Sequence, residues 1–543
     1  MANESQRNMR RRDFLAAAAA AGAAGLWWPR GLGAAGAGAP THNPAASLKL
    51  AWTDEIKWGT VVDITAVAGP DWAERLARAQ ALVAGQGGGV VYFPPGDYRF
   101  ADSIQLLSGV VLRGAEPSPV TRAQDDKYAP PTRFEFPKYE AANEGEGTPI
   151  LRAFKGVYLA EPASASNCGL VNIAFERGHV RFGEGEEHQC GRNRLVFGCV
   201  FRNCAVADAA VPDTKIGQHA WQRFTNRFGA AIDVKTAQNA LVANNRVPKS
   251  GEANFTMNGY VLRAGGKNPP KAVDGIVFDY DNRPGIYVNH FNIGGAGGQG
   301  PDGTPETHPY GFRQGIVIRD NYLYHTGRCA IGFCGDGVRC ENNVIRFAPD
   351  EWRPTNTGRD LTSGSATNDN RAMEMRGWRW VVSGNDYVVH RNWAFDKKYR
   401  INDGEGLMHE DHANSTVKDS VLTNNRGNTY LSIYKTAGID GLLVEGNEIR
   451  LGDGQQTIAG GAAIFVSANR TNDPFPCRNV RILNNTVAGG GILISGVPGE
   501  NNVVKGNKAV NGPLKLRNQA NAAVEGNEGF VVDNTPWQPH KKK

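Results

Sequence analysis

Two short runs of this sequence place acids and bases in patterns that could do chemistry. In the first, Ala372 to Arg376, charged and apolar side chains alternate. Alternation is typical of a strand with one face in a core, so Met373 and Met375 should point inward and Glu374 and Arg376 outward. Glu374 is therefore predicted to be catalytic, and Arg376 to bind substrate.

The second run, Gly404 to His412, holds three carboxylates and two imidazoles in nine residues. A following run, Leu431 to Lys435, adds an outward Tyr434 that could contact substrate and Lys435 as a possible base. The further predicted catalytic residues are Glu405, His409, Glu410, Asp411 and Lys435. Two structural alternatives stay open. The acids could form a salt-bridge network with Arg376, Lys397, Lys398 and Arg400, and His409 and His412 could be structural.

Tryptophans gather in the same part of the chain. Aromatic rings bind the apolar faces of sugars, so these side chains are predicted to form carbohydrate subsites. The four residues are Trp352, Trp378, Trp380 and Trp393. For Trp378 and Trp380, which are two apart on an expected strand, burial in a core is the alternative.

A recurring asparagine reveals the elements that must position these residues. The repeated pattern is an apolar residue, two variable residues, Asn and another apolar residue. The marker asparagines are Asn321, Asn343, Asn385, Asn425, Asn447, Asn485, Asn507 and Asn527. Their spacings of 22, 42, 40, 22, 38, 22 and 20 residues indicate a base period near 22 with three long insertions.

A unit of this length with several short strands cannot bury its own apolar side, so the units must stack. The pattern predicts a parallel β-solenoid in which the marker Asn occupies a left-handed turn position and its amide hydrogen-bonds along the stack. The insertions, residues 346–371, 387–404 and 451–462, begin at the same phase of the coil. They should therefore form the walls of a groove beside the candidate residues.

The start of the repeat resembles a known family. Val62-Asp63-Ile64-Thr65, a helical stretch from Asp71 to Ala84, the Gly-rich run 87–98 and Ser108 to Gly114 resemble the opening of the pectate-lyase superfamily. The resemblance implies an all-β, right-handed parallel β-helix with a short N-terminal capping helix. It also implies a choice among pectin and alginate lyases, polygalacturonase-like hydrolases, sugar epimerases and phage tailspikes, because fold alone does not select a reaction.

The N-terminus resembles a twin-arginine export signal. Arg10 to Arg12 and Phe14-Leu15 precede a modest apolar run, Ala16 to Trp28, which is too short to span a bilayer. We expect residues 1–39 to be this signal, 40–58 a linker, 59–535 the β-helix and 536–543 a tail. The expected location is periplasmic or extracellular. Cys329 with Cys334, or Cys199 with Cys204, could form disulfides after export.

The net charge of +6 comes from the two termini, since residues 1–39 contribute +3 and Lys541 to Lys543 another +3. The nearly neutral body gives no reason to expect nucleic acid or a membrane surface as a partner. We expect a polysaccharide or oligosaccharide substrate, no membrane span after signal cleavage, and a monomer or homotrimer.

Three functions fit these residues. The first is an exported glycoside hydrolase that pairs Glu374 with Glu405, Glu410 or Asp411 and needs no cofactor. Adjacent coils would bring two such carboxylates to about 5 Å, near the spacing of retaining enzymes, and alternate coils to the inverting range. The second is a uronate lyase or epimerase, with Lys435, Tyr434 or His409 as base and Arg376 or Ca²⁺ neutralising the sugar carboxylate. The third is a non-catalytic glycan-binding solenoid.

Overall fold

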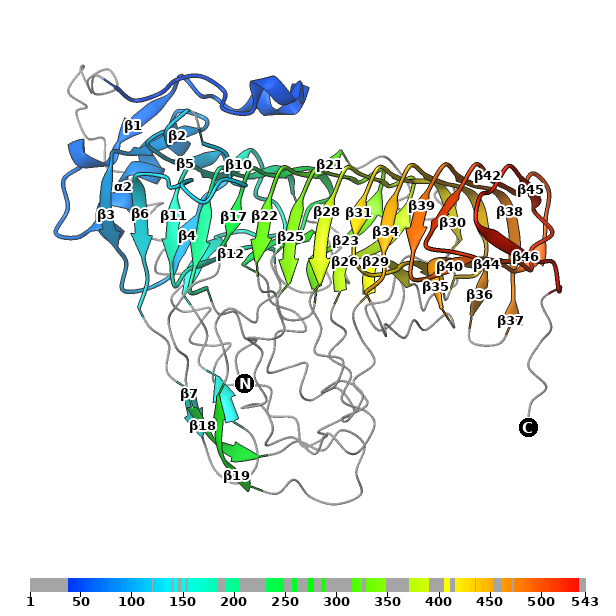
Figure 1. The fold of residues 1–543 in the computed structure, drawn as a ribbon. Coiled ribbons are helices and arrows are strands. Elements are labelled where there is room, and N and C mark those ends of the chain that lie inside the picture. Colours follow the sequence, from blue (N-terminus) through cyan, green and yellow to red (C-terminus); the bar gives the residue numbers. More distant parts are fainter. Residues whose placement is uncertain are drawn as a thin grey trace.

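The structure is a computed structural model. It describes residues 38–119, 121–137, 141–143, 149–151, 155–183, 191–204, 231–248, 256–260, 272–277, 286–288, 315–324, 329–347, 371–389, 405–410, 416–434, 436–452, 461–470 and 473–536. Three long parallel sheets dominate this part of the chain and run along a single rod (Figure 1). Successive strands pass from sheet A to sheet B to sheet C and back to sheet A, which confirms the predicted all-β parallel β-helix.

Sheet A begins each coil. Its strands are β1 (Val61–Asp63), β2 (Gly89–Phe93), β5 (Val110–Gly114), β10 (Cys168–Val171), β13 (Arg192–Phe197), β16 (Gln238–Ala243), β21 (Ile316–Arg319), β24 (Arg339–Glu341), β27 (Val381–Ser383), β30 (Val417–Thr423), β33 (Ile439–Glu445), β38 (Pro476–Leu483), β42 (Val503–Lys505) and β45 (Ala523–Glu525), with β41 (Val497–Pro498) beside β38.

Sheet B follows across a tight corner. Its strands are β3 (Gly96–Arg99), β6 (Thr132–Glu135), β11 (Ala174–Glu176), β14 (Val200–Arg202), β17 (Arg246–Val247), β22 (Tyr322–Tyr324), β25 (Val344–Phe347), β28 (Asp386–Val389), β31 (Arg426–Gly427), β34 (Glu448–Arg450), β39 (Thr486–Ala488) and β43 (Lys508–Val510).

Sheet C completes the coil and carries most of the predicted site residues. Its strands are β4 (Ile104–Leu106), β9 (Gly156–Leu159), β12 (His179–Phe182), β15 (Ile232–Val234), β20 (Ile286–Val288), β23 (Cys329–Asp336), β26 (Arg371–Trp378), β29 (Glu405–Glu410), β32 (Leu431–Tyr434), β35 (Ala462–Ser467), β40 (Gly491–Ser495), β44 (Leu514–Asn518) and β46 (Phe530–Asp533). Three antiparallel pairs lie outside the coil: β7 (Ala141–Asn143) with β8 (Pro149–Leu151), β18 (Thr256–Tyr260) with β19 (Ala272–Val277), and β36 (Asn469–Arg470) with β37 (Asp473–Pro474).

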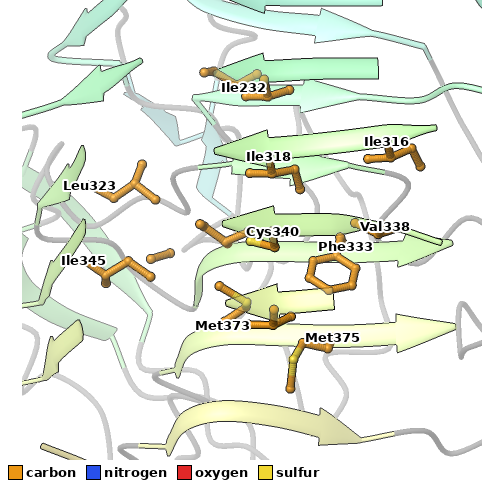
Figure 2. Close-up of a cluster of buried hydrophobic side chains, with 14 of the residues drawn as sticks. Ile232, Ile316, Ile318, Leu323, Phe333, Val338, Cys340, Ile345, Met373 and Met375 are labelled. Carbon is orange, nitrogen blue, oxygen red and sulfur yellow. The ribbon is translucent and has the colours of Figure 1, made fainter. Parts of the chain in front are cut away.

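The interior of the rod is one continuous apolar core. Figure 2 shows Phe333, Met373 and Met375 of sheet C with Ile318 of sheet A and Ile345 of sheet B, all inside the coil. Each stacked layer buries its apolar side chains against the layers above and below, which is the source of stability in a repeat that cannot fold alone. The predicted inward direction of Met373 and Met375 is confirmed.

A buried ladder of asparagines fixes the corner between sheets A and B. Each side-chain amide donates to the carboxamide oxygen of the next ladder residue, at 2.9 Å from Asn425 to Asn447 and from Asn447 to Asn485. The ladder runs through Asn245, Asn321, Asn343, Asn385, Asn425, Asn447, Asn485, Asn507 and Asn527. The predicted hydrogen-bonded stack is confirmed.

The left-handed turn residue is not the ladder Asn, which corrects the prediction. It is the residue before it, as at Asn342 (φ 54°), Asn424 (φ 55°) and Gly446 (φ 66°). The ladder side chain must point into the corner to bond its neighbours, so the reversal of the chain falls on the preceding Asn, Asp or Gly.

A helix and a strap cover the N-terminal coils. Helix α2 (Trp72–Gly85) begins at Asp71, whose carboxylate accepts from the Glu74 amide at 2.8 Å, and it buries Leu76, Ala79 and Val83 against the first coil. The Gln80 side chain of α2 donates to the Gln105 carbonyl in β4 and accepts from the Leu107 amide just after it, so the helix pairs backbone groups at the open end of the coil. The predicted capping helix is confirmed.

Residues 40–58, which were expected to be a linker, pack along the outer face of sheet A. They include the short helices η1 (Ala46–Leu48) and η2 (Ala51–Glu55), and η3 (Ile64–Ala66) follows β1. Trp52, Ile56 and Trp58 form an apolar cluster with sheet A residues such as Leu195 and Leu241. The buried guanidinium of Arg113 donates to the His42 carbonyl at 2.6 Å and lies over the Trp58 ring. The described helices include none that is long and apolar enough to cross a membrane.

All three predicted insertions fall between the end of a sheet B strand and the start of a sheet C strand. They connect β25 to β26, β28 to β29 and β34 to β35, so the prediction of a common phase is confirmed. Their predicted limits are too wide, because residues 346–347 and 387–389 belong to β25 and β28.

The predicted disulfides do not form. Cys199, Cys204 and Cys334 are buried and in no disulfide bond, which contradicts both the pairing of Cys199 with Cys204 and that of Cys329 with Cys334. Burial raises the pKa of Cys199 to about 12, so this thiol stays protonated and unreactive at neutral pH.

Substitution of a ladder asparagine in the middle of the stack should reduce stability more than substitution of one at its end. Asn447→Ala removes hydrogen bonds on both sides, including the amide bond to the Leu422 carbonyl at 2.9 Å, and leaves buried backbone groups unpaired. We expect a loss of about 2–4 kcal/mol in the free energy of unfolding. Asn527→Ala, at the partly exposed end of the ladder, should cost clearly less. Denaturant unfolding of both variants measures the difference, and equal losses would contradict the ladder's role.

Candidate functional site

One register line on the outer face of sheet C organises the candidate site. Its residues pair in sequence across eleven strands, while the residues next to them along each strand, such as Val180, Met373 and Ile433, lie in the interior. The line, called the outer line below, consists of Tyr158, Arg181, Asp233, Tyr287, Gly332, Glu374, Met408, Ser432, Phe465, Leu493 and Arg517. Ten strand spacings of about 4.8 Å make it roughly 48 Å long.

A tyrosine–histidine pair stands near the N-terminal end of this line. The Tyr158 hydroxyl lies 2.8 Å from Nε2 of His179, and the two rings meet edge to face. His179 is two residues before Arg181 on β12, so both point outward. Burial, and to a smaller extent the charge of Arg181, lower the pKa of His179 to about 3, although a hydrogen bond with the backbone at Lys155 acts in the opposite direction. The imidazole is therefore neutral at ordinary pH.

Charged residues continue the site on the neighbouring coil. Asp233 pairs in register with Arg181, and its carboxylate lies 3.5 Å from the ammonium of Lys235. Both Asp233 and Lys235 are nearly fully buried. Among the described residues here, Arg181 and Lys235 carry positive charges and Asp233 a negative one, a balance that favours an anionic ligand.

The predicted centre of the site is an ion pair. Glu374 and Arg376 point outward as predicted, but they are only 0% and 3% exposed, and the guanidinium donates to the carboxylate at 2.6 Å. A carboxylate in contact with a guanidinium is held in its charged form, which is opposite to what a general acid requires. Glu374 therefore suits a structural or electrostatic role better than proton donation.

The strand register also changes the expected spacing of carboxylates. Glu374 lies opposite Gly332 and Met408, whereas Glu405 lies opposite Arg371 at the start of β26. Glu410 is two residues beyond Met408, so its Cα is about 8 Å from that of Glu374, combining one strand spacing with two residues along the strand. This register therefore places neither Glu405 nor Glu410 at the expected distance of about 5 Å from Glu374. The side chains of Glu405 and Glu410 lie outside the description.

His409 points into the coil, which corrects its prediction as a catalytic base. It pairs in register with Met375 and Ile433, both interior residues, and is 0% exposed. Its ring stacks on Trp380 with centroids 6.2 Å apart. Trp380 belongs to the interior core, so it cannot contact a ligand outside the rod, and its predicted role as a subsite is also corrected.

The remaining predicted residues divide into placed and unplaced ones. Trp378 is 1% exposed, so its ring offers no open face to a sugar, contrary to the prediction. Tyr434 faces outward as predicted, since Ile433 is interior, and its ring lies against Phe465 with centroids 6.0 Å apart. Trp352, Trp393, Asp411 and Lys435 lie outside the described residues.

No metal site is evident in the described part of the chain, where groups of three or more His, Cys, Asp or Glu that could hold an ion are not found. Asp411 and the side chains of Glu405 and Glu410 fall outside this part. The Ca²⁺ site considered for a lyase therefore stays a prediction.

The tyrosine–histidine pair was missed by the sequence analysis, although a local signal existed. His179-Val180-Arg181-Phe182 and Val157-Tyr158-Leu159 show the same alternation that singled out Glu374. The marker asparagines used for the repeat begin at Asn321, so the stacking of these earlier coils was not inferred. Where a long insertion separates two coils, the sequence alone does not show which of their residues become neighbours.

Comparisons with known proteins give distant structural similarity only. No protein-family model matches the chain, and no curated protein matches it. The A-module of the mannuronan C-5 epimerase AlgE4 of Azotobacter vinelandii is 11% identical, with 88% of this chain and 98% of that one covered and a TM-score of 0.41. A PL6 alginate lyase in complex with a trisaccharide is 13% identical, with 87% and 85% covered and a TM-score of 0.39. A tailspike protein of E. coli bacteriophage HK620 is 13% identical, with 86% and 69% covered and a TM-score of 0.40. The reaction has to be argued from the site.

The buried ion pair makes a test of structural against catalytic roles possible. Glu374→Gln should lower the free energy of unfolding by about 3 kcal/mol, because it leaves the Arg376 charge buried without its carboxylate. The double variant Glu374→Gln/Arg376→Gln should recover part of this loss. The matched control is Glu448→Gln on sheet B, whose partners Arg426 and Arg450 are exposed, and it should cost less than about 1 kcal/mol. The free energies of unfolding are measured with denaturant. A loss for Glu374→Gln as small as that for the control would refute the structural role.

The neutral His179 predicts a distinct loss of stability in acid. The unfolded chain takes up a proton near pH 6.5, whereas the folded imidazole does so only near pH 3, so stability falls as pH decreases through this window. At pH 4.5 the contribution is about 3 kcal/mol relative to pH 7. His179→Gln should flatten the dependence by this amount. The measurement is denaturant unfolding of both proteins at several pH values, and parallel curves would count against a buried neutral imidazole.

Proposed function

We propose that this protein is an enzyme acting on an acidic polysaccharide, as a lyase or C5 epimerase, on the outer face of sheet C. The observation that supports it most directly is the contact of the Tyr158 hydroxyl with the neutral imidazole of His179, beside Arg181. This arrangement combines a proton-transfer group with a cation at one point of the outer line.

Removal of the C5 proton of a uronate needs the negative charge of the sugar carboxylate to be offset. Arg181 supplies a guanidinium that can bind a carboxylate through two hydrogen bonds. Neutralising that carboxylate makes the adjacent C–H bond more acidic, because the electrons left on C5 delocalise into it. Lys235 on the next coil adds a second positive charge near the same place.

Tyr158 is the proton-transfer group in this proposal. In the lyase reaction its hydroxyl gives a proton to the leaving oxygen O4 as it receives the proton from C5. The C5–H electrons form the C4–C5 double bond, the C4–O4 bond breaks, and the tyrosine ends in the state in which it began. His179, with a pKa near 3, is too weak a base for this step and acts as a positioning residue for the hydroxyl.

A glycoside hydrolase is the second candidate, favoured by the register of β26 and β29. In this register the Cα atoms of Glu374 and Glu410 are about 8 Å apart, so a pair of carboxylates on neighbouring coils could supply an acid and a base. The guanidinium of Arg376 on Glu374 counts against this reading, because it opposes a raised carboxyl pKa.

We also propose export in the folded state, as the twin-arginine pattern implies. Six described cysteines are buried and in no disulfide bond. A chain that crossed a membrane unfolded would expose these thiols to oxidation before the coils formed, whereas one folded in a reducing compartment would hide them first. A periplasmic or extracellular location follows from this route.

The reaction is tested with purified protein on polygalacturonate, alginate and neutral glycans. A lyase yields products that absorb in the ultraviolet, an epimerase exchanges the C5 hydrogen with deuterated solvent, and a hydrolase yields reducing ends without absorbance. A protein that binds glycans but shows none of these reactions would refute the enzymatic proposal and favour the glycan-binding reading.

Tyr158→Phe should lower kcat at least about 100-fold, because it removes the proton-transfer group and keeps the ring. His179→Gln should lower kcat less and change the pH profile, as expected for a positioning residue. Tyr98→Phe is the matched control, since its hydroxyl bonds the Pro94 carbonyl at 3.0 Å far from sheet C's outer face. Activity of Tyr158→Phe equal to that of this control would overturn the assignment.

A further inference from the structure

Exposure along the outer line changes beside the proposed reaction centre. Gln105 on β4 extends the line by one strand, lies in register with Tyr158 and is exposed. Tyr158 and Arg181, on the next two strands, are partly exposed. Asp233, which follows them on β15, is only 3% exposed. A ligand can therefore reach this centre from the side of β4 and not from the side of β15.

Buried charged residues close the side of β15. Lys235 is nearly fully buried, and its ammonium lies 3.5 Å from the Asp233 carboxylate. A Cβ at Gly183, the residue after β12, would lie 2.5 Å from that of Lys235, so the lysine packs directly against the end of β12. Farther along the outer line Glu374 and Ser432 are also fully buried. A sugar chain bound at the centre has no open face in this direction.

The other side of the centre ends at the end of the rod. β4 is the first strand of sheet C in the described part of the chain, and it lies at the end of the rod that α2 covers (Figure 1). Gln105 points outward, because Ile104 and Leu106 on either side belong to the core. Helix α2 bonds the backbone of β4 and leaves Gln105 exposed. A chain bound at Tyr158 can therefore leave the rod past Gln105.

The open stretch is short. Two strand spacings separate β4 from β12, which corresponds to roughly 10 Å. Arg181 stands at the closed end, Tyr158 in the middle and Gln105 at the open end. The carboxamide of a glutamine can donate to a carboxylate or a hydroxyl of a sugar next to the reacting one. This order suits the end of an acidic chain and not a chain that continues in both directions.

We propose that the enzyme acts on the end of an acidic polysaccharide and not within the chain. The inference rests on the proposed function and adds the position of attack to it. The terminal uronate binds with its carboxylate on Arg181, and the rest of the chain, attached through O4, leaves past Gln105.

The chemistry of the lyase step then fixes which end reacts. Tyr158 takes the C5 proton and gives its own to O4, the C4–C5 double bond forms, and the C4–O4 bond breaks. In a 1→4-linked uronan, a terminal unit that carries the chain on its O4 is the reducing end. The lyase product is therefore a single unsaturated sugar, and an epimerase would invert C5 in the terminal unit only.

The first experiment follows the products formed from polygalacturonate and alginate. A lyase acting at the chain end should release unsaturated monosaccharide from the first time point, and ultraviolet absorbance should rise while the viscosity stays nearly constant. An epimerase should bring deuterium from the solvent into the terminal unit only. Unsaturated oligosaccharides with an early fall in viscosity, or deuterium spread through the chain, would overturn the inference and leave the proposed function standing.

The second experiment blocks the chain end. Borohydride converts the reducing end of each polymer to an open-chain alditol, so the terminal ring that should bind at Arg181 is lost. We expect the rate on the treated polymer to fall at least about tenfold. Equal rates on treated and untreated polymer would contradict attack at the reducing end.

A variant tests the direction in which the chain leaves. Gln105→Ala should raise KM about fivefold with little change in kcat, because it removes a hydrogen bond to the second unit and touches no reacting atom. Gln238→Ala is the matched control, since Gln238 is an exposed glutamine of β16 on sheet A. Thermal unfolding of both variants is measured alongside. A KM for Gln105→Ala equal to that of the control would count against exit past β4.

A protein without turnover would refute the proposed function, and binding then decides the inference separately. Calorimetric titration with a uronate trisaccharide and with its borohydride-reduced form gives two dissociation constants. A reduced form that binds at least about tenfold more weakly would leave recognition of the chain end standing. Equal binding of the two forms, or binding of neither, would refute it.

Discussion

The register of stacked coils is the constraint on which the rest of the molecule depends. Parallel strands fix each residue opposite one residue of the next coil, and the Asn ladder locks this register at the corner between sheets A and B. Because the ladder amides are buried, a slip of one residue would break several hydrogen bonds and invert the faces of the strand. Residues far apart in sequence, such as Arg181 and Arg517, are thereby held on one straight line.

Much of this arrangement could be predicted from the sequence, because it follows from local rules. The Asn period, the Asp71 start of the capping helix and the alternation around Met373 each report on neighbours within a few residues. Alternation gave the outward direction of Glu374 correctly. It could not give its burial or its contact with Arg376, which depend on what covers the face.

The failures have a common physical cause. The pairing of one coil with the next depends on how many residues each insertion adds to the repeat. The sequence does not mark where the next strand begins after an insertion. His409 was read as outward within a run that is polar at most positions, yet register with Met375 and Ile433 turns it inward. Tyr158 and His179 are 21 residues apart, and only the pairing of β9 with β12 makes them partners.

The two candidate centres on sheet C, Glu374–Arg376 and Tyr158–His179, differ in whether their surroundings permit proton transfer. In the Glu374–Arg376 pair, opposite charges meet at 2.6 Å, so proton transfer would have to break that contact. In the Tyr158–His179 pair, burial and the nearby Arg181 keep the imidazole neutral. The ion pair, whose two residues both lie on β26, is therefore better suited to a structural role on that strand than to proton transfer.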